Sequence, residues 1–95
     1  MSAIPRVERI RQALTAHLAP VELTIRDDSA AHAGHAGARE GGHFSVLVVS
    51  EQFAGRTRTQ RHQLVYAALA ELMRTDIHAL SIQAETPQEK DRSTI

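Results

Sequence analysis

The stretch HFSVLVVS, residues 43–50, is the strongest strand signal in the chain and sets its fold class. Its four consecutive apolar residues, 46–49, are typical of a strand that is central in its sheet or covered on both faces. A helix and a strand are predicted before it, and a helix and a strand after it. The resulting order, α-β-β-α-β, predicts an α+β fold.

Two elements are predicted upstream of this strand. Residues 5–18 carry apolar side chains at three- and four-residue spacing, which indicates a helix that ends before Pro20. Residues 21–26, VELTIR, alternate between apolar and polar side chains, which indicates a half-buried strand. Residues 27–42 then form a long loop rich in alanine and glycine, and we expect residues 30–42 to be mobile in the isolated chain.

Two more elements are predicted downstream. Residues 59–73 have a broad apolar face and indicate a helix, with Thr59 as its N-cap. Residues 77–83, IHALSIQ, indicate a third strand. The alternation along this strand predicts three side chains on the same side of the sheet: His78, Leu80 and Ile82.

These elements predict a three-stranded mixed sheet with both helices on one face. The first two strands can pair antiparallel through the loop, and the second helix is a crossover that makes the third strand parallel to the second. The chain of 95 residues is long enough for a single domain, residues 1–95, and too short for two. Residues 87–95 are polar, and we expect them to fray; a terminal helical turn is the alternative.

Composition excludes several classes of protein. Eleven basic residues balance eleven acidic ones, which argues against a purely electrostatic nucleic-acid binder. The chain has no cysteine, which excludes a disulfide scaffold, a thiol nucleophile and a zinc ribbon. It shows neither a membrane-spanning apolar run nor a signal-peptide pattern, so we expect a cytoplasmic protein that does not enter membranes.

Several motifs give the chain a resemblance to the BolA family. The stretches that carry it are Asp28-Ser29 with the loop that follows, HFSV at 43–46, FAGR at 53–56, RHQLVY at 61–66, IHALSI at 77–82 and Thr86-Pro87. The resemblance implies a fold like that of the class II KH domain. It also implies two roles: partnership with a monothiol glutaredoxin around a shared 2Fe-2S cluster, in cluster trafficking or iron sensing, and DNA binding as a transcriptional regulator. It does not imply an enzyme.

The resemblance also implies ligands for such a cluster. It places one at the loop residue His32, for which His35 could substitute, and the other at His78. Two imidazoles on one iron are chemically workable, as in Rieske centres. The two missing thiolates would come from a glutaredoxin cysteine and from bound glutathione, so the isolated chain is expected to hold no cluster.

Each histidine also has a simpler interpretation. His32 could be a solvated loop residue, and His78 a hydrogen-bonded strand residue. His17 can interact favourably with the negative end of the first helix dipole. His43 is expected to be structural. His62 could serve packing, partner contact or DNA contact.

A basic run precedes and enters the second predicted helix. No acidic residue lies between positions 53 and 70. We expect these arginines to be exposed and to contact an acidic patch on a partner such as glutaredoxin, glutathione carboxylates or DNA phosphates. The run comprises Arg56, Arg58, Arg61 and His62.

Other functions are less well supported by the sequence. No Gly-x-x-Gly loop precedes the second helix, so DNA binding is the alternative rather than the first hypothesis. The Gly-x-x-Gly at residues 34–37 lies elsewhere in the predicted fold. No nucleophile paired with a base is recognisable, so we expect no enzyme. A homodimer through a sheet edge stays open.

Overall fold

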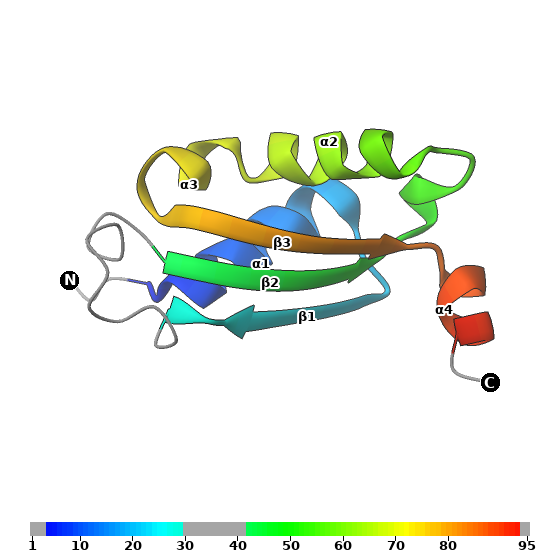
Figure 1. Ribbon diagram of the computed structural model, residues 1–95, viewed down its shortest axis with the longest axis horizontal. Coiled ribbons are helices and arrows are strands. Elements are labelled where there is room, and N and C mark those ends of the chain that lie inside the picture. Colours follow the sequence, from blue (N-terminus) through cyan, green and yellow to red (C-terminus); the bar gives the residue numbers. More distant parts are fainter. Residues whose placement is uncertain (1–3, 30–41, 94–95) are drawn as a thin grey trace.

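The computed structural model describes residues 4–29 and 42–93, and its sheet has the predicted topology (Figure 1). The strands are β1 (Glu22–Asp27), β2 (Gly42–Val49) and β3 (Ile77–Glu85). They lie in the order β1-β2-β3, with β1 antiparallel to β2 and β3 parallel to β2. The predicted three-stranded mixed sheet is therefore confirmed, with the long strand β2 at its centre.

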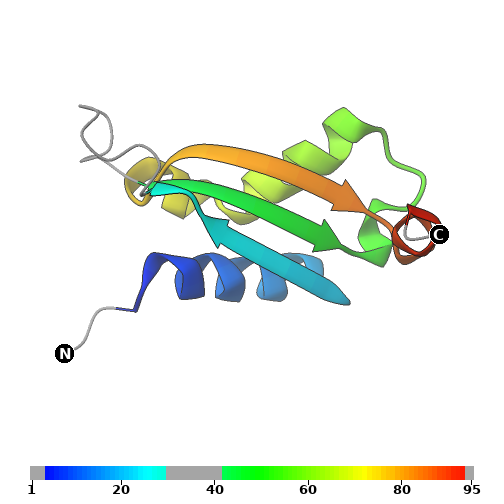
Figure 2. The same ribbon diagram turned by 60° about the horizontal axis from the view of Figure 1, so that its bottom comes forward.

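The helices are α1 (Arg6–Leu18), α2 (Arg58–Ala68), α3 (Ala70–Thr75) and α4 (Pro87–Ser93), with a short 3-10 helix, η3 (Glu51–Phe53), after β2. Helices α1 and α2 cover the same face of the sheet, as Figures 1 and 2 show together. None of the helices in the described part of the chain combines the length and the apolar character that spanning a bilayer requires.

The core lies between these two helices and the sheet. Its side chains are aliphatic apart from two phenylalanines, as the low aromatic content demands. Because strand side chains alternate between faces, β2 contributes every second residue to it. The buried core residues are Ile10, Leu14, Leu18, Phe44, Val46, Val48, Phe53, Val65, Ala68, Leu69 and Ile77.

Helix α2 begins earlier than predicted and is shorter. Its N-cap is Thr57, not Thr59, because Thr57 and Gln60 form a reciprocal capping box. The main-chain N–H of Gln60 donates to Thr57 Oγ1 (3.1 Å), and the main-chain N–H of Thr57 donates to Gln60 Oε1 (2.9 Å). The predicted single helix is also interrupted at the buried Leu69, where neither proline nor glycine marks the change.

The prediction that residues 87–95 fray is wrong for residues 87–93, which form α4. Thr86 and Glu89 make a second capping box: the main-chain N–H of Glu89 donates to Thr86 Oγ1 (3.2 Å), and that of Thr86 donates to Glu89 Oε1 (3.0 Å). Pro87 suits the first helical position. Lys90 Nζ, farther along α4, lies 3.7 Å from a carboxylate oxygen of Glu22 on β1.

Candidate functional site

His78 lies at the start of β3 and is exposed. In the register of β2 and β3, Gly42 pairs with Ile77 and His43 pairs with Ala79, so a β-bulge leaves His78 without a partner residue. The predicted alternation is therefore wrong at this point: Ile77 takes the core position, and His78 does not share the buried side of Leu80. Bulges of this kind re-aim a side chain and are frequent next to functional sites.

A second histidine lies beside it. The ring centres of His43 and His78 are 5.2 Å apart, with the ring planes tilted by 47°. The main chain of His43 is held by the turn after β1, because its N–H donates to Ser29 Oγ (3.1 Å) and its carbonyl accepts from the N–H of Asp28 (2.7 Å). Sequence reasoning treated His43 as structural; the pairing with His78 could only be found from the strand register.

The remaining histidines are distributed differently. His32 and His35 lie outside the described residues, so the structure leaves the predicted loop ligand untested. His17 is exposed on α1, and His62 is half-buried on α2. Within residues 4–29 and 42–93 there is no group of three or more potential metal ligands. The described residues thus bring together two imidazoles, those of β2 and β3.

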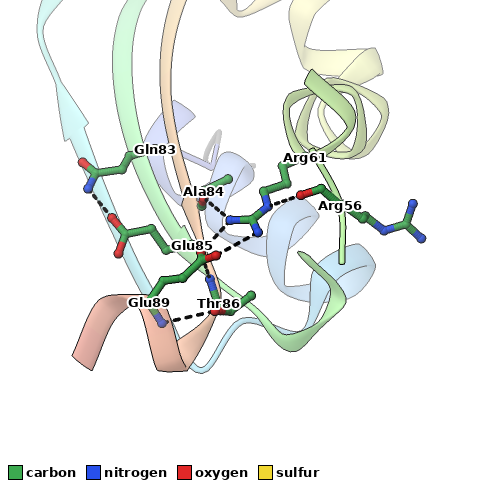
Figure 3. A network of polar contacts seen from close by, with 7 residues as sticks. All are labelled: Arg56, Arg61, Gln83, Ala84, Glu85, Thr86 and Glu89. Atoms are coloured by element: carbon green, nitrogen blue, oxygen red, sulfur yellow. Dashed lines mark hydrogen bonds and ion pairs between the residues drawn. The ribbon is translucent and has the colours of Figure 1, made fainter. Parts of the chain in front are cut away.

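The basic run lies toward the opposite end of β3 (Figure 3). Arg56 and Arg58 are exposed, as predicted, and His62 is half-buried. They line a cavity of about 300 Å³ together with Arg61 and residues 82–84 of β3. This cavity combines cationic side chains with the outer edge of the sheet, which is suited to an anionic partner.

Arg61 does not belong to the exposed charge of this cavity, which corrects the prediction. Its side chain is 13% exposed and makes a bidentate ion pair with Glu89 of α4, with nitrogen–oxygen distances of 2.6 and 3.0 Å. It also donates to the carbonyls of Arg56 (3.0 Å) and Ala84 (3.2 Å). Arg61 therefore joins the turn before α2, the end of β3 and α4.

The protonation behaviour of this pair follows from its hydrogen bonds. The pKa of Glu89 is lowered from 4.5 to about 2. The largest cause is the hydrogen bonding from Arg61, and the second is the hydrogen bond from the main-chain N–H of Thr86. The hydrogen bond with Glu89 raises the pKa of Arg61. Glu89 was missed by sequence reasoning, although the Thr86-Pro87-x-Glu89 pattern is a helix-start signal that could have found it.

The two features lie at opposite ends of β3, the strand labelled in Figure 1: the histidine pair includes His78 near its beginning, and the arginine-lined cavity includes residues 82–84 near its end. Ala84 lies six positions after His78, which corresponds to about 20 Å along the strand. Imidazoles can ligate iron, and guanidinium groups bind carboxylates or phosphates. The chain is therefore a small α+β domain with two candidate binding sites.

Comparison with known proteins identifies the family. Residues 14–89 match the family described as BolA-like protein. The chain is 47% identical over 88 residues to Protein BOLA1, chloroplastic, of Arabidopsis thaliana, covering 88% of this chain and 55% of that protein. The solved structure of BolA1 from Arabidopsis thaliana superimposes with a TM-score of 0.81 at 45% identity, covering 93% of this chain and 98% of that one. The chain therefore belongs to the BolA-like family.

Two further relatives carry informative names. The BolA domain of SufE1 from Arabidopsis thaliana superimposes with a TM-score of 0.80 at 43% identity, covering 93% of this chain and 99% of that one. The DNA-binding transcriptional regulator BolA of Escherichia coli (strain K12) is 39% identical over 82 residues, covering 86% of this chain and 76% of that protein. The chain spans about half the length of Protein BOLA1 and 24% of the whole SufE-like protein 1 of Arabidopsis thaliana.

Proposed function

We propose that this protein acts with a monothiol glutaredoxin in the binding, trafficking or sensing of a 2Fe-2S cluster. The observation that carries the proposal is an exposed strand histidine, His78, beside a second imidazole in a chain without cysteine. A cluster of this type needs four ligands, and two imidazoles on one iron are sufficient for half of them. This chain would therefore supply two nitrogen ligands, and a partner cysteine and glutathione would supply the two thiolates.

The role of the chain in this complex is to hold imidazoles in place. His78 lies between Ile77 and Ala79, which both pair with β2, and its exposure leaves it accessible to a partner. The cluster would be cargo or signal, shared with the partner, and the proposal assigns no catalytic step to this chain. The arginine-lined cavity could supply a separate attachment point for an acidic partner surface.

Reconstitution tests the proposal. The chain is mixed with a monothiol glutaredoxin, glutathione, ferric iron and sulfide under anaerobic conditions, and visible absorption and circular dichroism are recorded. We expect a mixed complex whose spectrum differs from that of the glutaredoxin alone. His78→Ala should abolish this difference, whereas His17→Ala, on the exposed side of α1, should preserve it. A spectrum that survives His78→Ala would contradict the proposal.

A second candidate function is DNA binding through the exposed Arg56 and Arg58. The specific observation that favours it is the similarity to a relative named as a DNA-binding transcriptional regulator. Contact with phosphates would make the affinity fall steeply with salt. Fluorescence anisotropy of a labelled duplex, titrated at several salt concentrations, tests this function. Binding that is absent at low salt would eliminate it.

A further inference from the structure

We propose that the outer edge of β3, together with the first turns of α2, binds an extended acidic peptide segment of a partner protein by strand addition. This site lies away from His78 and needs no cluster, so it goes beyond the proposed function and can fail while that function stands. The feature behind it is the cavity of about 300 Å³ lined by α2 and by residues 82–84 of β3. Figures 1 and 2 both show α2 running beside β3, the outermost strand on that side of the sheet.

The main chain of β3 offers pairing groups on its outer side. In the strand order β1-β2-β3 of the described residues, β3 has a neighbouring strand on one side only. The carbonyl of Ala84 faces outward, because it accepts a hydrogen bond from Arg61 of α2 (3.2 Å). The carbonyl of Glu85 faces the other way and accepts from the main-chain N–H of the residue that follows β2 (2.9 Å). Because these directions alternate along a strand, the main-chain groups of Leu80 and Ile82 also point outward, where an added strand can pair with them.

Arg61 sets the limit of this edge. Its guanidinium occupies the carbonyl of Ala84 and is itself held by Glu89 of α4 (Figure 3). An added strand therefore pairs with residues 80–83 and ends at the ion pair. This restricts the site to a short segment and disfavours pairing with the whole edge of another sheet.

The charges around the cavity define the chemistry of the segment. Arg56 and Arg58 both line the cavity and are exposed. The two carboxylates nearby, Glu85 and Glu89, each accept hydrogen bonds from side chains of the chain itself (Figure 3). The charge of the two exposed arginines therefore favours a segment that carries aspartate or glutamate.

Two features favour a peptide over a nucleic acid in this cavity. The outward main-chain groups of Leu80 and Ile82 include donors and acceptors, which match the main chain of a peptide and not a sugar–phosphate backbone. Among the described residues that line the cavity, none is phenylalanine, tyrosine or tryptophan, so bases would lack the stacking platforms common in single-strand binders. The half-buried Ile82 instead offers an apolar contact to a side chain of the segment.

Binding of a synthetic peptide tests the proposal. The probe is a short, terminally blocked, fluorescein-labelled peptide in which glutamate alternates with valine, so that all its carboxylates can face α2. Anisotropy is measured with the whole chain at physiological ionic strength, where distant charges are screened. We expect binding, and we expect the matched peptide with glutamine in place of glutamate to bind at least about tenfold more weakly.

Variants of the chain locate the site. The double variant Arg56→Ala, Arg58→Ala should weaken binding of the acidic peptide about two- to thirtyfold, as expected for two exposed ion pairs. The double variant Arg6→Ala, Arg74→Ala is the matched control: it removes the same charge from exposed positions on α1 and α3 and should bind like the wild type. Circular dichroism and urea unfolding confirm that each variant is folded.

A second measurement separates strand addition from simple attraction between charges. Two further peptides are N-methylated, one at every glutamate and one at every valine, which removes main-chain donors and keeps the charge. At least one of them should lose binding, because an added strand needs its N–H groups. In nuclear magnetic resonance, the unmethylated peptide should slow hydrogen exchange at the amides of Leu80 and Ile82.

Three results would overturn the proposal. The first is that the acidic peptide does not bind, or binds no better than its glutamine counterpart. The second is that both methylated peptides bind as well as the unmethylated one. The third is that a labelled DNA duplex, and not the peptide, binds in a way that depends on Arg56 and Arg58, since the cavity would then be a nucleic-acid site. None of these results alters the cluster spectrum by which the proposed function is tested.

Discussion

Basic side chains lie at both ends of β3, but they differ in what they contact. At the beginning of the strand, exposed His78 lies beside another imidazole. At its end, Arg61 is enclosed by a carboxylate and two main-chain carbonyls. In the sequence, His78 and Arg61 both look available to a partner. The comparison teaches that a basic side chain is available to a partner only where groups of the chain itself do not already bind it.

This difference in contacts also predicts which residues contribute to stability and which are available for function. A residue whose charge is satisfied within the chain contributes to the free energy of unfolding, because its loss leaves partners unpaired. A residue exposed at a strand end contributes little to it and is available for ligation or recognition. Stability measurements on matched variants at the two ends can therefore test the distinction.

The largest effect is expected at Arg61. Arg61→Ala removes the bidentate pair with Glu89 and two hydrogen bonds to main-chain carbonyls, so we expect a loss of about 1–3 kcal/mol in the free energy of unfolding. Arg58→Ala, an exposed arginine of the same helix, is the control and should change it by less than about 0.5 kcal/mol. Urea titration measures both. Equal effects of the two variants on the free energy of unfolding would show that Arg61 contributes no more to stability than the exposed Arg58.

A dependence on pH should follow from the same pair. The pKa of Glu89 is lowered on folding from 4.5 to about 2, so its ionised form stabilises the native state. This contribution is complete above about pH 4.5 and is lost as the pH falls from there toward 2. Glu89→Gln should thus destabilise the protein at pH 7 and much less at pH 3, as measured by urea unfolding. A difference that is constant across this range would contradict the role of the pair.

A moderate effect on partner binding is expected for the arginines that remain exposed. The double variant Arg56→Ala, Arg58→Ala should leave the fold intact and weaken an anionic partner at the cavity. If the partner is DNA and both side chains contact phosphates, the salt dependence of binding should decrease by about two units of slope. Anisotropy titrations measure the slope. Arg61 is left out of this variant because its loss would confound binding with stability.

The smallest effect is expected for the stability of the chain without partner after His78→Ala. The side chain is exposed, so we expect a change of less than about 0.5 kcal/mol in the free energy of unfolding. Thermal and urea unfolding of the isolated chain check this. A larger loss would show that His78 supports the fold at the bulge, and the two ends of β3 would then not differ in the way described.

Much of the fold could be predicted because its signals are local. The apolar run in β2, the alternation in β1 and the periodic faces of α1 and α2 each lie within one element. The right-handed crossover rule then limited the topology to the observed one. The start of α2 and the existence of α4 were also encoded locally, in the capping boxes at Thr57 and Thr86, although Thr59 was the predicted N-cap and residues 87–95 were predicted to fray.

The sequence by itself determined the α+β class, the resemblance to the family, the absence of thiolates and the candidacy of His78. The tertiary structure alone decided that His43 lies beside His78 and that Arg61 is neutralised by Glu89. The physical reason is separation along the chain. Periodicity and capping report on residues a few positions apart, whereas these pairs meet only through strand register and helix docking. The β-bulge also depends on strand pairing. His78 has no partner residue on β2, and this changes the direction of its side chain although no residue in the sequence signals it.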